Sequence, residues 1–460
     1  MFDEGTTAAP EADLPVCPKL AELAARARKE DRLTNVVQFV DEELLRLAFG
    51  SLRKQAAPGV DGQRYEDYAA NLDENLKDLH ARLTTGRYQA PVIRRVYIPK
   101  ANGKLRALGI TTIEDRVVQK AVAWVLSAVY EQDFLDCSQG FRPKRSAHMA
   151  LRRLRNGMLQ HWAKYVVEVD VVGYFDHVNH DWLRKFLRHR VNDGGLLRLI
   201  DKWLKAGVME NGVVTTAEDG TPQGGPASPV LANVYLHYVL DLWFERRFKK
   251  GCRKWTELTR YCDDFVAAFQ DREDAERFRR EVEERLAVFG LHVAPEKTAV
   301  LLFDGNLLKG NRRPAIKPAT FTFLGFTHYL TKTRRGTINI GRTASTKARE
   351  RFLRRQADWL KANRHLPTRL QQTHLHLALN GYYQYFGVRL AEQALYSVYR
   401  RIRKLWRKQL RRRSERPTHL CLVGPLCEIL VPTSSSANHT GVGLKPSSSS
   451  NGCALGSRVR

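Results

Sequence analysis

The chain has 460 residues, of which 43% are hydrophobic, enough to form the cores of two or three ordinary domains. Lys and Arg number 76 against 49 Asp and Glu, a formal charge of +27 that favours a polyanionic partner, nucleic acid first. No apolar run reaches the roughly 18–20 residues needed to cross a bilayer, and the N-terminus is acidic where a secretory signal is basic and then apolar. We therefore expect a cytoplasmic protein without a membrane partner.

The N-terminal half predicts helices around one short β pair. Helix-period patterns cover residues 17–54, 63–85, 113–131 and 145–160. The first two are separated by APGVDG, whose Pro, Gly and Asp-Gly indicate a turn. Two β-like segments, VIRRVYIPK and KLRALGI, flank the turn ANG.

The middle of the chain alternates strands and helices. KYVVEVDVVGYF predicts a strand, residues 181–206 a helix, and residues 229–248 a long apolar helix after a glycine-rich stretch. RYCDDFVAAF predicts a hairpin, residues 272–289 an amphipathic helix, and TFTFLGFTHYL another strand. Helices interleaved with short strands predict an α+β fold with a small sheet.

The C-terminal part is helical and basic from about residue 345. Residues 351–416 hold 17 Lys and Arg against 3 Asp and Glu, about half of the excess positive charge. From residue 417 the chain turns polar and rich in Ser and Gly, which predicts a disordered tail. The seven scattered cysteines, without a C-x-x-C pair, predict neither a disulfide framework nor a zinc ribbon.

Three aspartates are candidate metal ligands. Asp170 ends the strand YVVEVD, and Asp263 and Asp264 occupy the predicted hairpin turn. If the strand lies beside the hairpin, the three carboxylates converge and supply the oxygen ligands that Mg²⁺ prefers. Two such ions, about 3.5–4 Å apart, can activate a hydroxyl and stabilise a leaving pyrophosphate. The alternative is that Asp263 and Asp264 form a solvated hairpin turn, a common use of Asp. The two adjacent aspartates alone do not decide between a metal site and such a turn.

The surrounding motifs resemble those of bacterial group II intron reverse transcriptases with a maturase domain. YCDD resembles the Y-x-D-D box, and DVVGYFDHVNHDWL resembles the first palm motif. Five further stretches, from about residue 36 to 416, are similar to the same family: AAPGVDG, IPKANGKLRALGITTIEDRVVQKAV, QGFRPKRSAHMAL, GTPQGGPASPVLANVYLHYVLD and LNGYYQYFG followed by RRRSER. Cys262 stands where the family usually has Ala or Met.

The resemblance implies a right-hand polymerase that copies RNA into DNA with two Mg²⁺ ions. Asp170 and Asp263 are then the main metal ligands and catalytic residues, with Asp264 the third acid. Phe175 takes the place of the steric gate against the 2′-hydroxyl, with core packing as its alternative. The other substrate-binding residues implied are Arg94, Lys100 and Arg106 on the finger strands, Gln223 at the nascent base pair, and Lys297 near the pyrophosphate. The basic residues of the finger strands could instead form a solvated face, and Lys297 could be a surface lysine in a salt bridge.

The family also implies a domain plan and partners. We predict an N-terminal extension over 1–35, fingers and palm over 36–335, a helical thumb and maturase domain over 336–416, and the tail over 417–460. Arg400, Arg401, Arg403 and Lys404 are predicted to bind intron RNA. Primer–template, dNTPs and target DNA complete the expected partners, and no H-N-H nuclease motif is visible.

Two alternatives stay open at this stage. One is a reverse transcriptase that serves phage defence or CRISPR adaptation with another RNA. The other is a splicing-only RNA-binding maturase, which the intact YCDD, Asp170 and PQG oppose.

Overall fold

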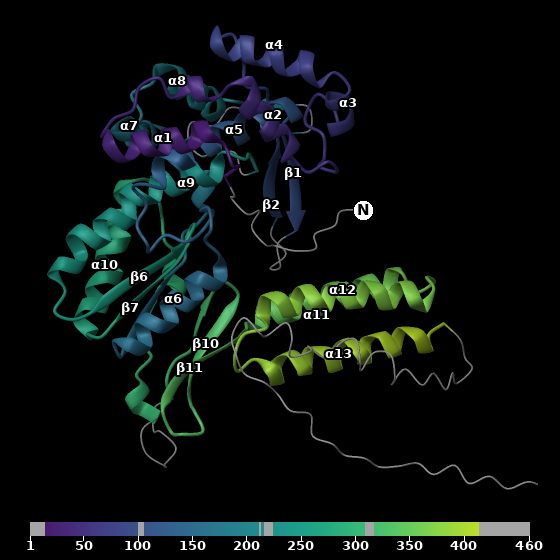
Figure 1. The fold of residues 1–460 in the computed structure, drawn as a ribbon. Helices are drawn as coiled ribbons and strands as arrows, with labels where there is room; N and C mark the ends of the chain where they lie inside the picture. Colours follow the sequence, from purple (N-terminus) through teal and green to yellow (C-terminus); the bar gives the residue numbers. More distant parts are fainter. Residues whose placement is uncertain (1–13, 100–104, 211–212, 216–223, 309–316, 414–460) are drawn as a thin grey trace, which may run out of the picture. The chain divides into compact units, whose positions relative to one another are not determined.

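The computed structural model describes residues 14–99, 105–210, 213–215, 224–308 and 317–413. These residues form two compact units, one ending at Ala348 and the other beginning at Arg349 (Figure 1). The predicted tail, Lys100 and Gln223 lie outside the described residues. The predicted domain limits at 35, 335 and 416 stay predictions.

The N-terminal part of the larger unit is helical and is built on α5. Its helices are α1 (Pro18–Lys29), α2 (Glu42–Gly50), α3 (Tyr65–Ala69), α4 (Leu72–Thr84) and α5 (Ile113–Tyr130). Because nearly every residue of α5 is buried, with α1 and α2 packed against it, this helix forms the centre of the core. The single pattern predicted over 17–54 is two helices, because Asp41 caps a new one by accepting the Leu44 N–H at 2.8 Å.

A four-stranded sheet follows, in the order β2-β1-β4-β5. Strands β1 (Ile93–Pro99) and β2 (Leu105–Ile110) form the predicted antiparallel pair, with Arg94 opposite Ile110. The sequence analysis missed β4 (Val208–Glu210), which lies parallel to β1, and β5 (Val213–Thr215).

The central sheet carries the aspartates and has the order β6-β7-β3-β8. Its strands are β6 (Thr256–Tyr261), β7 (Asp264–Phe269), β3 (Tyr165–Val169) and β8 (Ala299–Leu302), and all pair antiparallel. Helices α6 (Ala147–Gln160) and α10 (Arg272–Val288) pack against it (Figure 1). The predicted strand and hairpin are therefore neighbours, and β8 is an edge strand that the sequence analysis missed.

Two further predicted elements are divided in the structure. Residues 181–206 form α7 (His180–Arg190) and α8 (Gly194–Leu204), because Asp193 caps α8 by accepting the Leu196 N–H at 3.0 Å. TFTFLGFTHYL forms β9 (Phe321–Phe323) and β10 (Phe326–Lys332), since Leu324 and Gly325 both have positive φ, as a tight two-residue hairpin turn requires. Strand β11 (Ile338–Ala344), also missed, pairs with β10.

The helix that begins at α9 (Ser228–Leu236) continues as two π-helical segments, His237–Asp241 and Phe244–Phe248. It covers the span predicted from Pro229 to about Phe248. Nearly all its residues up to Asp241 are buried, which agrees with its apolar sequence.

The smaller unit consists, where described, of α11 (Thr346–Ala362, which starts within the larger unit), α12 (Thr368–Phe386) and α13 (Glu392–Arg411). Trp406 of α13 is buried and donates its indole N–H to Gln371 of α12 at 2.8 Å. The rings of Phe352 and Tyr382 pack with centroids 4.4 Å apart. The predicted α+β class with a helical C-terminal part is confirmed. No helix in the described ranges is long and apolar enough to cross a membrane.

Buried His328 of β10 is expected to make the stability of the larger unit sensitive to acid. Its ring stacks on Phe321 with centroids 4.4 Å apart, and burial, with Arg342 adding to it, lowers the pKa of His328 to about 3. Between pH 6.5 and 3 the unfolded chain binds a proton there that the folded chain excludes, so this contribution is complete above pH 6.5 and is lost as the pH falls.

We expect His328→Phe to keep the stack and remove this acid sensitivity. Between pH 7.5 and pH 4.5 the variant should lose about 2–3 kcal/mol less unfolding free energy than the parent, since a pH unit corresponds to about 1.4 kcal/mol. Thermal unfolding at the two pH values measures the difference. His189→Phe, at an exposed position, is the matched control. Equal pH dependence in parent and His328→Phe would contradict the expectation.

Candidate active site

The residues 261–264, the YCDD turn, form a two-residue hairpin loop between β6 and β7. Tyr261 pairs with Asp264, so Cys262 and Asp263 make the loop itself. Cys262 has φ of +59°, a conformation that favours glycine at the first position of such loops. Cys262 is also buried. The tight turn therefore places Asp263 at the end of the central sheet.

Asp170 lies at the same end of the strands because β3 pairs antiparallel with β7, and we call this end of the central sheet the aspartate edge. Val169 is opposite Phe265, so the residue after Val169 adjoins Asp264. The backbone fixes Asp170 from the other side, where its carbonyl accepts the Ala294 N–H at 2.8 Å. The three aspartates thus meet at one edge through the register of two strands.

The charges at this edge influence one another. Asp264 keeps solvent-exposed surface, but surrounding protein atoms crowd its carboxyl group, and this burial raises the pKa of Asp264 to about 7. The Leu324 N–H, 3.3 Å from Oδ2, opposes the shift, while the charges of Asp263 and Asp170 add to it. The edge therefore carries concentrated negative charge that a cation would stabilise.

The donor set fits a hard divalent cation. All three side chains offer carboxylate oxygens, the ligands typical of Mg²⁺, which usually keeps several waters and needs only one or two protein carboxylates. In the part of the chain that the structure describes, no three His, Cys, Asp or Glu side chains are already gathered around one metal position. Their role as metal ligands stays a prediction.

Phe175 lies close to Asp170 in the chain, in a short 3₁₀ helix, Tyr174–Asp176. Its ring is half-buried and meets Tyr174 edge to face, with centroids 5.2 Å apart. Tyr174 is fully buried and donates its hydroxyl to the Ala232 carbonyl at 2.8 Å. Tyr174 therefore anchors this segment, and Phe175 keeps an exposed part that an incoming sugar could contact.

The predicted triphosphate-binding residues are only partly described. Arg94 donates to the Pro58 carbonyl at 2.6 Å, and Arg116 donates to the Ala57 carbonyl at 2.6 Å, so both guanidinium groups hold the APGVDG loop. Arg106 lies on β2 opposite Ile98 and Lys297 ends a 3₁₀ turn, with both side chains outside the described part. The substrate-binding roles stay predictions.

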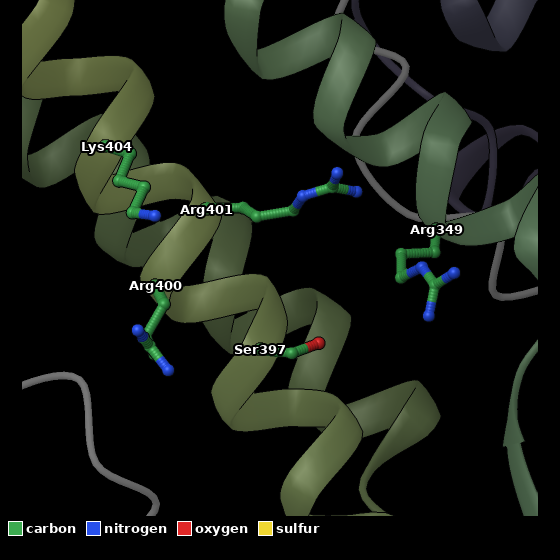
Figure 2. A pocket seen from close by; sticks show the side chains of 5 residues that line it. All are labelled: Arg349, Ser397, Arg400, Arg401 and Lys404. Atoms are coloured by element: carbon green, nitrogen blue, oxygen red, sulfur yellow. The ribbon is translucent and has the colours of Figure 1, made fainter.

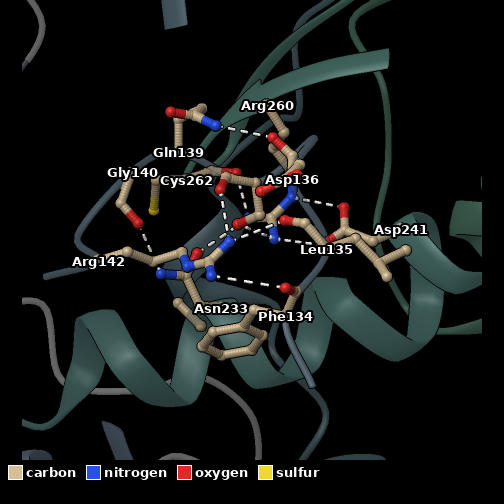
Figure 3. Close-up of polar contacts among 12 residues, drawn as sticks. Phe134, Leu135, Asp136, Gln139, Gly140, Arg142, Asn233, Asp241, Arg260 and Cys262 are labelled. Carbon is tan, nitrogen blue, oxygen red and sulfur yellow. Dashed lines mark hydrogen bonds and ion pairs between the residues drawn. The ribbon is translucent and has the colours of Figure 1, made fainter. Parts of the chain in front are cut away.

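A buried network beneath the YCDD turn was missed by the sequence analysis. Arg260, just before Tyr261, has no exposed surface and pairs with the equally buried Asp241 (Figure 3). Its other donors reach Asn233, Ser138 and the Cys262 carbonyl. The signal in the sequence was an arginine in LTRY, the segment that leads directly into the YCDD turn.

A second site, the basic pocket, lies in the smaller unit. It has a volume of about 330 Å³ and is lined by Arg349 of α11 and by four residues of α13, namely Ser397, Arg400, Arg401 and Lys404 (Figure 2). The four α13 positions have the i, i+3, i+4, i+7 spacing of one helix face. Arg403, predicted with this group, is not among the lining residues, and the sequence analysis missed Arg349 and Ser397.

The part of the chain that carries the three aspartates matches a known family. The reverse transcriptase (RNA-dependent DNA polymerase) family matches residues 98–328, half of the chain. This segment contains β3, the YCDD turn and α9. The chain belongs to the reverse transcriptase family.

The chain is also similar to relatives of which two carry names that refer to introns. It is 40% identical over 197 residues to Protein YkfC of Escherichia coli (strain K12), covering 42% of this chain and 51% of that one. It is 42% identical over 175 residues to Group II intron-encoded protein LtrA of Lactococcus lactis subsp. cremoris, covering 37% and 29%. Nuclear intron maturase 1, mitochondrial, of Arabidopsis thaliana is 33% identical over 92 residues, which cover 20% of this chain and 13% of that one. The chain thus spans about half or less of these relatives' lengths.

Proposed function

We propose that the chain is an RNA-directed DNA polymerase that extends a primer on an RNA template with dNTPs. The placement of Asp170, Asp263 and Asp264 next to one another, where β3 ends and β7 begins, carries this proposal. Membership of the reverse transcriptase family supports it. A cytoplasmic location goes with the proposal.

The residues of the aspartate edge have separate tasks in the proposed reaction. Asp170 and Asp263 would hold two Mg²⁺ ions, and when bound these ions supply the positive charge that activates the primer 3′-hydroxyl and stabilises the leaving pyrophosphate. The turn and the β3–β7 register hold the two carboxylates in position. Phe175 would contact the sugar of the incoming nucleotide, and Arg94, Lys100 and Arg106 would bind its phosphates. Gln223 would contact the nascent base pair, and Lys297 the pyrophosphate.

We further propose that the smaller unit binds structured intron RNA and so assists splicing and retrohoming, with target DNA as a further partner. Its basic pocket combines four cationic side chains with one hydroxyl and has no carboxylate among its lining residues. Guanidinium and ammonium groups with this arrangement bind phosphate oxygens. The relatives whose names refer to group II introns and intron maturases support this partner over another RNA.

Primer extension tests the polymerase proposal. Purified protein with Mg²⁺, dNTPs and a DNA primer on an RNA template should yield full-length DNA, and omission of the metal should stop synthesis. RNA binding without any synthesis would favour a splicing-only maturase. Equal affinity for intron RNA and for an unrelated structured RNA would favour a reverse transcriptase with another biological role.

The basic pocket predicts a steep salt dependence of RNA binding. Replacing Arg349, Arg400, Arg401 and Lys404 together by Gln should weaken intron RNA binding at least tenfold. It should also reduce the slope of log affinity against log salt by up to about 3 units, since each phosphate contact contributes about 0.7–0.9. Filter binding at several salt concentrations measures both effects.

A matched control removes four charges elsewhere. Lys250, Arg272, Arg279 and Arg280 are exposed residues of the larger unit, and their replacement by Gln changes the net charge by the same amount. If the control and pocket variants have the same salt slope, binding depends on overall charge and the pocket has no special role.

A further inference from the structure

We propose that the buried Arg260–Asp241 ion pair is a positioning device that fixes the conformation of the YCDD turn and thereby the place of the Asp263 carboxylate. The inference rests on the proposed metal-dependent polymerase function. It assigns to two residues beneath the turn a role in metal affinity, beyond their contribution to stability.

Every donor of the Arg260 guanidinium has a partner. Nε and Nη2 bind the two carboxylate oxygens of Asp241 at 2.8 and 2.5 Å (Figure 3). Nη2 also donates to Ser138 Oγ at 2.7 Å, and Nη1 donates to Asn233 Oδ1 at 2.9 Å and to the Cys262 carbonyl at 3.0 Å. Because guanidinium has five N–H groups in a planar fork, this set fixes its orientation completely. One of the five bonds goes directly to the loop that carries Asp263.

The turn is held at both ends of Cys262. Its carbonyl accepts from Arg260, while its amide nitrogen lies against Gly140, where a Cβ would come within 2.5 Å. The Gly140 carbonyl accepts the Asn233 side-chain N–H at 2.7 Å, so Asn233 joins both supports. The adjoining loop is held as well, because the Ser138 and Leu135 carbonyls accept from buried Arg142 at 2.8 and 2.7 Å (Figure 3). These supports restrain Cys262 in the positive-φ conformation that a non-glycine residue disfavours.

The π-helical segment places Asp241 under the turn. Asn233 and Asp241 are eight residues apart, which in an α-helix is two turns plus about 80°. The wider turn of the segment His237–Asp241 takes up this excess, so that both side chains reach the same guanidinium. Such π segments often occur at functional sites.

The energetics favour a positional role. A buried ion pair gives little net stability compared with apolar residues of similar volume, because both charges lose their hydration. Burial alone lowers the pKa of Arg260, but the Asp241 carboxylate outweighs this and raises it above the ordinary value, so the pair stays charged. Apolar residues could not replace the N–H that Arg260 donates to the Cys262 carbonyl.

The test measures metal affinity together with stability. Arg260→Lys keeps the charge but loses the fork, and the double variant Arg260→Met, Asp241→Leu removes both charges at once. The control Arg190→Met breaks a partly buried ion pair between Arg190, the last residue of α7, and Asp133, which follows α5; the paired atoms are 2.7 Å apart. Electron paramagnetic resonance measures Mn²⁺ binding with primer–template present. The melting temperature and the Mg²⁺ dependence of primer extension are measured for the same variants.

We expect Arg260→Lys and the double variant to bind Mn²⁺ at least tenfold more weakly while they remain folded. The Mg²⁺ concentration for half-maximal extension should rise by a similar factor. Arg190→Met should lower the melting temperature and leave metal affinity unchanged. If Arg260→Lys binds Mn²⁺ within twofold of the parent and differs only in melting temperature, the pair is merely structural and the inference is wrong.

The same measurements separate this inference from the proposed function. A parent protein that binds Mn²⁺ but extends no primer would contradict the polymerase proposal. In that case weaker Mn²⁺ binding by Arg260→Lys would still support the positioning role. Gly140→Ala offers an independent check, because its added Cβ displaces the Cys262 amide and should weaken Mn²⁺ binding with the ion pair intact.

Discussion

Asp263→Asn and Asp170→Asn are each expected to reduce primer extension by at least a hundredfold. Asn keeps the size of Asp but removes the charge that a divalent cation requires. Since a metal ion contributes several kcal/mol to transition-state stabilisation, and about 1.4 kcal/mol corresponds to a factor of ten, loss of one ligand should nearly abolish synthesis. Single-turnover extension of a DNA primer on an RNA template measures the rate.

Two comparisons make this result specific. Asp181→Asn changes a highly exposed carboxylate in the first turn of α7 and should leave the rate within about twofold. The Asp170 and Asp263 variants should keep full affinity for intron RNA, because the basic pocket belongs to the other unit. Substantial extension by Asp263→Asn would remove the basis of the proposed metal site.

The positions of Asp170 at the end of a strand and of Asp263 and Asp264 in a hairpin could be predicted, because they depend on local signals. KYVVEVD is rich in β-branched residues, and the run after YCDD is apolar, so both segments had to be buried strands. Once β3 lies beside β7, antiparallel pairing brings Asp170 next to Asp264. The sequence could not supply the register itself, which sets which residues meet.

Most of the missed strands are those whose identity depends on partners. Strands β4, β5 and β8 have three or four residues each, too few for a period-2 pattern to stand out, whereas β11 has seven and was missed despite its length. Each is a strand because a neighbour supplies its hydrogen bonds, as β3 does for β8. The division between α7 and α8 had a local signal, the Asp-Gly-Gly at 193–195, that the helical pattern on both sides obscured.

The buried network was beyond prediction from spacing. Arg260 meets Asp241, Asn233 and Ser138 across 19, 27 and 122 positions of the chain. Only the fold brings these segments together, and an arginine in a strand such as TELTRY is equally compatible with an exposed position. The motif QGFRP shows the same limit, because its Gly140 is explained by the backbone of the YCDD turn rather than by its own neighbours.

Phe175→Ala is expected to reduce discrimination against ribonucleotides by roughly 10–200-fold while dNTP incorporation persists. Binding pockets discriminate by about this factor between substrates that differ by one small group. The missing ring leaves room for the 2′-hydroxyl of a ribonucleotide. Because the ring is only half-buried, the loss of stability should stay below the ~3–5 kcal/mol of a fully buried phenylalanine. Steady-state incorporation of dNTP and rNTP at one template position measures the ratio, with Phe175→Tyr as the control that keeps the ring. A large drop in melting temperature with unchanged sugar selectivity would identify Phe175 as a packing residue.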